Sequence, residues 1–112
     1  MVTKKKTEQV YEDRGAPPRG YELVAVISPE IADEQLETRV NEISNFITER
    51  GGVMSDVEQW GKRKLAYAIG GFTEGNYVLY RFEANPAICK EVESNLQIAE
   101  DILRFLLIRA EG

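Results

Sequence analysis

A chain of 112 residues has room for one hydrophobic core, and 43% apolar against 29% charged residues is the composition of an ordinary globular domain. The net charge of −5 gives no overall attraction to nucleic acid, so a polyanion site would have to be a local basic patch. Cys89 is the only cysteine, which excludes an internal disulfide and cysteine-rich zinc sites and fits a reducing compartment. No apolar run is long enough for a signal-peptide core or a membrane span, so we expect a cytoplasmic domain with no membrane partner.

Residues 1–18 combine scattered charges with a Gly15-Ala16-Pro17-Pro18 stretch, a composition that cannot bury a core. We predict that this segment is a disordered N-terminal tail and that residues 19–112 form the folded domain. The first 20 residues carry five cations against three carboxylates, so the tail could contact RNA or serve only as a linker.

Residues 21–28 form a short run rich in β-branched residues that ends at Pro29, which is typical of a buried central strand. Residues 33–50 then repeat apolar residues at helical spacing, with Asp33 as the expected N-cap and Gly51-Gly52 as the stop signal. The apolar face of this predicted helix consists of Leu36, Val40, Ile43 and Ile47.

Two further segments, residues 53–69 and 77–84, have strand character, and the glycine-containing stretch 70–76 between them predicts an antiparallel hairpin. Asn85-Pro86 is a strong helix start, with Asn85 as the cap and Pro86 at the first helical position. Residues 102–108 close the chain as a last strand.

The order strand, helix, strand, strand, helix, strand predicts an α+β, ferredoxin-like βαββαβ fold: a four-stranded antiparallel sheet with two helices on one face. Because side chains alternate along a strand, the second sheet face would carry apolar residues from the first and last strands. A solvated face should be polar at these positions, so either a partner covers them or they only favour strand formation. The outward residues are Val24, Val26, Leu106 and Ile108.

Catalytic chemistry finds little support in the sequence. The chain has no histidine, and Cys89 lies on an apolar helix without a basic neighbour to activate its thiol. The pairs Gly51-Gly52 and Gly70-Gly71 follow or join elements as turns and do not precede a helix as a phosphate-binding loop does. We therefore expect no enzyme, no cofactor, no metal and no small-molecule substrate.

The most informative segment is residues 58–69, where Lys62, Arg63 and Lys64 stand between Trp60 and Tyr67. Residues 60–81 carry four cations and one carboxylate in a chain that is acidic overall. Such a patch suits RNA, because lysine and arginine neutralise phosphates and aromatic rings stack on bases. The alternative is a solvated hairpin in which lysines protect an exposed strand edge.

This segment resembles the bacterial small-subunit ribosomal protein S-six family. The family pattern Trp-Gly-Lys-Arg-Arg/Lys-Leu-Ala-Tyr-Pro-Ile is similar to residues 60–69, WGKRKLAYAI. The resemblance continues through residues 75–84 (GNYVLYRFEA) and 101–105 (DILRF), and residues 19–22 (RGYE) are similar to the family's start. It departs from the family at Ala68, where proline is usual, at Ala32, where many relatives have serine, and in the extra N-terminal tail.

The resemblance implies a ferredoxin-like structural protein of the cytoplasmic ribosome that assembles the central domain of the small subunit with ribosomal protein S-eighteen. It also implies contact with small-subunit ribosomal RNA, and the outward apolar face then has S-eighteen as its candidate heterodimer partner. The residues that match RNA-contact positions are Arg19, Lys62, Arg63, Lys64 and Tyr67.

A fold does not determine a function, and the same order of elements also serves regulatory domains that bind small ligands and dimeric monooxygenase-like enzymes. An enzyme would need a pocket with titratable groups, against which the missing histidine argues. A small-ligand-binding regulatory domain remains the alternative, and it would not require Lys62, Arg63 and Lys64.

Overall fold

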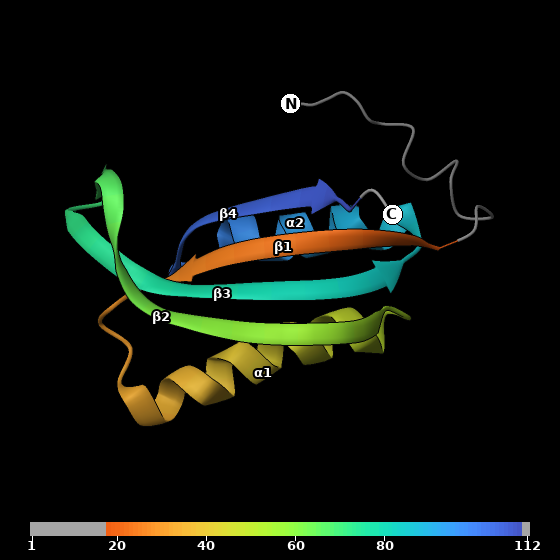
Figure 1. The fold of residues 1–112 in the computed structure, drawn as a ribbon, viewed down its shortest axis with the longest axis horizontal. Coiled ribbons are helices and arrows are strands. Elements are labelled where there is room, and N and C mark those ends of the chain that lie inside the picture. Colours follow the sequence, from red (N-terminus) through yellow and green to blue (C-terminus); the bar gives the residue numbers. More distant parts are fainter. Residues whose placement is uncertain (1–17, 111–112) are drawn as a thin grey trace.

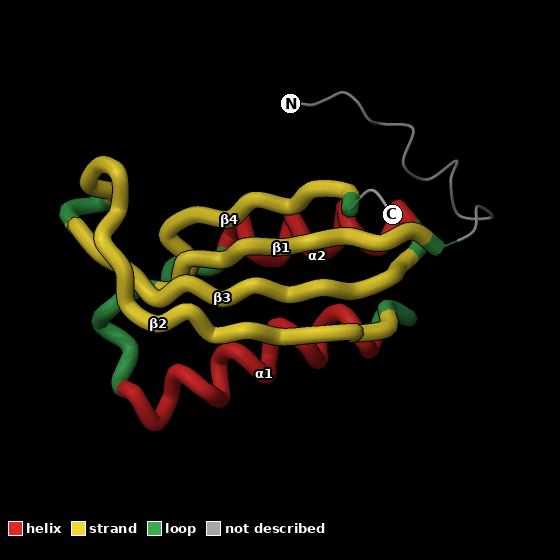
Figure 2. The backbone as a smooth tube through the Cα atoms, viewed as in Figure 1, coloured by secondary structure: helices red, strands yellow, loops and turns green. Residues whose placement is uncertain are grey.

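The computed structural model describes residues 18–110. In chain order they form β1 (Arg19–Ile27), α1 (Asp33–Glu49), β2 (Val53–Ile69), β3 (Phe72–Ala84), α2 (Pro86–Ile98) and β4 (Ile102–Arg109). The strands make an antiparallel sheet in the order β2-β3-β1-β4 (Figure 1; Figure 2). The predicted ferredoxin-like fold is therefore confirmed, whereas the predicted disordered tail lies outside the described residues except for Pro18.

The core lies between the sheet and the two helices, which cover the same sheet face. Leu23, Ala25 and Ile27 of β1 point into it as the strand alternation predicted, and they pack against buried residues of both helices. Tyr80 is fully buried, and its hydroxyl donates a hydrogen bond to the Val40 carbonyl of α1 at 3.0 Å, so its polar atom is satisfied. The helical core residues are Val40, Ile43 and Ile47 of α1 and Val92 and Leu96 of α2.

The two helix starts differ in how they are capped. Asn85 caps α2 as predicted, since its side chain accepts a hydrogen bond from the Ala87 amide at 2.9 Å. The prediction that Asp33 caps α1 is wrong: Asp33 is the first helical residue, and the cap position holds Ala32, which has no side-chain acceptor. Asp33 instead places its charge in the first turn, where it suits the positive end of the helix dipole.

An ion pair ties α1 to the turn that precedes β4. Arg39 donates from Nε to Oδ2 of Asp101 at 2.6 Å and from Nη2 to Oδ1 at 3.1 Å. Both side chains are largely shielded, and the planar fork of arginine matches a carboxylate at two points. This pair connects segments 62 residues apart and holds the second helix-strand unit against the first.

The hairpin between β2 and β3 is longer and tighter than predicted. β3 begins at Phe72, not at residue 77, and only Gly70 and Gly71 form the turn. Both have positive φ, 56° and 86°, which is the backbone of a two-residue turn that glycine adopts without strain. The stretch 72–76, which was expected to be loop, is therefore strand.

Candidate nucleic-acid interface

The outer part of the β2–β3 hairpin leaves the sheet as a two-stranded arm. The last residue of β1 that pairs with β3 is Ile27, opposite Asn76, and Asn76 in turn pairs with Lys62. We call residues 62–75 the hairpin arm. In Figure 1 the arm rises past the end of the sheet on the side where β4 begins.

Lys62, Arg63 and Lys64 lie at the base of the hairpin arm, and all three are exposed. Within the described part of the chain, none of the three forms an ion pair. Arg63 lies over the Trp60 ring, 5.4 Å from its centre, and donates from Nε to the Trp60 carbonyl at 3.4 Å. The base of the arm is thus a local cation cluster in which no described member forms an ion pair, with Glu74 opposite Lys64 in the strand register as its one carboxylate neighbour by pairing.

Trp60 continues this cluster onto the outer sheet face. Its ring stacks on Tyr77 with centres 6.4 Å apart and planes 13° from parallel. A register shift between Gln59 and Gly61 places Trp60 at a bulge, and such a bulge bends the strand and turns the arm away from the sheet. Arg63, Trp60 and the half-buried Tyr77 therefore form one stack where the arm leaves the sheet, exposed at Arg63 and Trp60.

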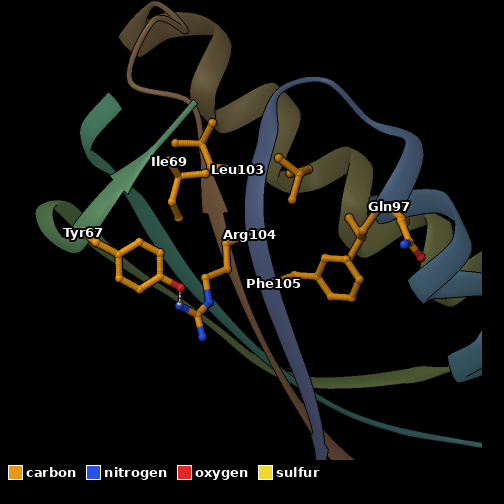
Figure 3. Close-up of a pocket in the computed structure, with 8 residues that line it drawn as sticks. Tyr67, Ile69, Gln97, Leu103, Arg104 and Phe105 are labelled. Atoms are coloured by element: carbon orange, nitrogen blue, oxygen red, sulfur yellow. Dashed lines mark hydrogen bonds between the residues drawn. The ribbon is translucent and has the colours of Figure 1, made fainter. Parts of the chain in front are cut away.

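Arg104 of β4 contacts the hairpin arm, although it lies 37 residues after Tyr67 in the chain. Its Nη1 donates a hydrogen bond to the Tyr67 hydroxyl at 3.2 Å, and Figure 3 shows the two side chains pointing toward one another. Sequence reasoning missed Arg104, although it lies in the quoted 101–105 motif and shares the outward alternation of Leu106 and Ile108. Its partnership with Tyr67 is a consequence of the bent arm.

Arg81, counted with the basic segment in the sequence, does not belong to the cation cluster. It donates to Glu22 at 3.1 Å, to Asp56 at 3.2 Å and to Glu58 at 3.0 Å on the outer face of the sheet. Hydrogen bonds from Trp60 and then Arg81 lower the pKa of the Glu58 carboxyl, which keeps it charged. Three carboxylates around one guanidinium make this part of the face acidic, and the strand alternation of Asp56 and Glu58 could have indicated it.

The outer sheet face between these charged regions is apolar, as predicted. Leu106 and Ile108 of β4 are 52% and 47% exposed, and Val24 is half-buried beside them. Val26 faces the same side but is only 2% exposed, so the expectation that it offers contact surface is corrected.

The base of the arm explains the burial of Val26. A Cβ on Gly75 would lie 2.5 Å from Cγ1 of Val26, so only a glycine lets β3 pass this closely. The apolar surface that remains open comprises Val24, Leu106 and Ile108, beside a hollow of about 190 Å³ that Tyr77 also lines.

Arg19 lies apart from the other predicted RNA-contact residues. It begins β1 and pairs with Ala84, whereas the arm leaves the sheet at the opposite end of that strand, beyond Ile27. Eight residues of extended strand separate the two ends by roughly 25 Å. Arg19 and the cation cluster therefore form two separate positive points.

The one cysteine of the sequence lies in α2. Cys89 is half-buried against the core, and burial raises the pKa of its thiol to about 12, so that it stays protonated at neutral pH. Within residues 18–110, no group of three carboxylate or cysteine side chains is placed to hold a metal ion. Among the same residues, no helix is long and apolar enough to span a bilayer.

A ferredoxin-like sheet with an open apolar face and a projecting cationic arm defines a class of small domains built to contact other macromolecules. A sequence model of the family described as ribosomal protein S6 matches residues 20–109. The small ribosomal subunit protein bS6 of Moorella thermoacetica is 40% identical to this chain over 93 residues, which cover 83% of this chain and 95% of that relative. The bS6 protein of Natranaerobius thermophilus is also 40% identical over 93 residues, covering 83% and 97%.

A solved structure supports the same assignment. The crystal structure of 30S ribosomal protein S6 from Thermotoga maritima has 32% sequence identity and a TM-score of 0.79, covering 83% of this chain and 88% of that one. The chain therefore belongs to the ribosomal protein S6 family, the S-six family that its motifs resemble. It is a structural constituent of the small ribosomal subunit, and its location is the bacterial ribosome in the cytoplasm.

Proposed function

We propose that this protein binds central-domain ribosomal RNA of the small subunit as a heterodimer with ribosomal protein S-eighteen. The RNA contacts the base of the hairpin arm, through Lys62, Arg63, Lys64 and Tyr67, with Arg19 as a second, separate contact. S-eighteen covers the outer sheet face at Val24, Leu106 and Ile108.

The observation that carries the RNA contact is the cation cluster itself. A surface lysine or arginine in an ion pair has already lost most of its attraction for a phosphate, as Arg81 illustrates among its three carboxylates. Lys62, Arg63 and Lys64 keep their charge available and stand beside two exposed rings, Trp60 and Tyr67. Cations with adjacent aromatic rings are the usual means of binding single-stranded RNA.

The partner follows from charge and from the sheet face. A chain with a net charge of −5 binds a polyanion weakly by itself, so a basic partner that supplies countercharge should strengthen the complex. Leu106 and Ile108 are about half exposed and lie two residues apart on β4, on the sheet face that the helices do not cover. Apolar surface of this kind is stabilised by burial against a partner.

A gel-shift titration of a central-domain ribosomal RNA fragment tests the proposal. We expect weak binding by this protein alone, tight binding once S-eighteen is added, and a loss of affinity as salt rises. Changing Lys62 and Lys64 together to Gln should weaken the heterodimer's RNA affinity about tenfold or more and reduce the slope of log affinity against log salt.

The matched control changes Arg50 and Lys90 together to Gln. It alters the net charge by the same amount on the helix layer, far from the arm, and should bind RNA as the wild type does. Equal binding by both double variants would place the RNA elsewhere. Failure of the wild-type pair to bind any RNA would instead favour a domain that binds a small regulatory ligand.

A further inference from the structure

A hollow of about 450 Å³ lies between the hairpin arm and β4, and polar groups stand at its rim. Tyr67 and Ile69 of the arm form one side, and Arg104 and Phe105 of β4 form the other (Figure 3). Gln97 of α2 lines the far end of the hollow, across β4 from Tyr67 and Arg104 (Figure 3). The volume falls in the range of small-ligand sites, roughly 300–1,000 Å³.

The charge at this hollow is positive and available. Arg104 is exposed, and among the described residues its guanidinium bonds only to the neutral hydroxyl of Tyr67. The nearest acidic residue in sequence, Asp101, is held by Arg39 on the other side of the turn. Arg104 therefore extends the positive surface that begins with Lys62 and Lys64 at the base of the same arm.

The ring at the rim is open to a stacking partner. Tyr67 is 63% exposed, and its hydroxyl is fixed by Arg104. A tyrosine held at its tip is a preformed surface on which a base can stack without much loss of side-chain freedom.

We propose that this hollow binds one unpaired nucleotide of the RNA, with the base stacked on Tyr67 and the phosphate held by Arg104. This inference rests on the proposed RNA binding and adds to it a site for a single nucleotide, formed jointly by the arm and β4. A peptide segment of the protein partner is the competing occupant, but it would gain nothing from the free guanidinium unless it carried a carboxylate at that point.

The test uses the full chain with S-eighteen and a series of central-domain RNA fragments in which each unpaired nucleotide is replaced in turn by an abasic one. We expect Tyr67→Ala and Arg104→Gln each to weaken binding of the intact RNA roughly tenfold. Tyr67→Phe, which keeps the ring, should stay within about threefold of the wild type, and Lys90→Gln, which removes a remote exposed charge, should have no effect. Thermal melts of all variants establish that the fold is retained.

One abasic RNA should abolish the difference between wild type and Tyr67→Ala, because the ring then has no base to stack on. If Tyr67→Ala weakens every RNA of the series equally, or none of them, no nucleotide lies on this ring and the inference is wrong. In parallel, the affinity of each variant for S-eighteen is measured without RNA. A variant that loses affinity for S-eighteen but keeps the wild-type affinity for RNA would assign the hollow to the protein partner. Absence of RNA binding by the wild-type pair would reject the proposed function itself, an outcome distinct from either of these.

Discussion

The helix-covered face of the sheet and the apolar part of its outer face carry the same kinds of residue but differ in burial. On the helix-covered face, Leu23, Ala25 and Ile27 are fully buried, and water is excluded from the layer between strands and helices. On the outer face, Leu106 and Ile108 are similarly apolar but remain about half exposed. Burial against the helices stabilises the fold, whereas apolar surface on the outer face contributes free energy only when a partner covers it.

The largest expected effect comes from placing a glutamate, in two separate variants, at two neighbouring outward positions of the sheet that differ in burial. Val26→Glu should lower the free energy of unfolding by about 1–3 kcal/mol, because the carboxylate would be desolvated beneath Gly75, and Arg104, which lies opposite in the strand register, offsets only part of that cost. Leu106→Glu should change it by less than about 1 kcal/mol, because the side chain reaches water, and should weaken the binding of S-eighteen instead. Urea unfolding of both variants measures the difference, and similar losses would mean that Leu106 is buried in the free protein.

A smaller contrast separates two arginine ion pairs of the helix layer. Arg39→Gln should cost about 1–3 kcal/mol, because it leaves the largely shielded Asp101 carboxylate without its two-point partner. Glu91→Gln should cost no more than about 0.5 kcal/mol, because Glu91 and its partner Arg50 are both exposed and Arg50 keeps its contact over the Phe46 ring. Thermal unfolding of the two variants in the same buffer measures the difference. Equal decreases in Tm would show that the Arg39–Asp101 pair contributes no more to stability than a surface pair.

The smallest expected difference concerns the thiol of Cys89 in α2. Because the pKa of Cys89 is raised to about 12 in the folded protein, above its value of 9.0 in the unfolded chain, the thiolate forms first in the unfolded state. Stability should therefore decline progressively as pH rises from about 9 towards 12. Iodoacetamide at pH 8.5 should modify the native protein at least about tenfold more slowly than the urea-unfolded chain, and comparable rates would mean that the thiol is open to solvent.

Much of the fold could be predicted because the evidence for it lies in consecutive residues. The alternation in β1 assigned Leu23 and Val24 to opposite faces, and the Asn85-Pro86 pair marked the start of α2. The end of the hairpin could not be predicted in the same way, since residues 72–76 are loop-like in composition and become strand only by pairing with β2. The start of α1 was predicted one residue too late for a local reason: the cap position holds Ala32, whose side chain has no acceptor, so composition does not mark it.

The candidate site likewise has some features that consecutive residues predict and others that depend on residues far apart in the chain. The run Lys62-Arg63-Lys64 between two aromatic residues is local, so the sequence indicated the cation cluster. The neutralisation of Arg81 by Glu22 of another strand, and the burial of Val26 beneath Gly75, depend on residues far away in the chain. Neither could be read from the neighbourhood of the residue itself.

The sequence by itself determined the order of the elements, the two faces of the sheet and the position of the positive charge, because strand and helix periodicities are properties of neighbouring residues. Only the tertiary structure decided that the hairpin arm bends back to β4 and brings Tyr67 to Arg104, 37 residues further along. That contact depends on the register shifts of β2 between Gln59 and Gly61 and between Lys64 and Ile69, on the twist of the paired strands and on the position of β4 at the sheet edge. These are relations between segments, and the hollow between arm and sheet exists only once the segments have packed.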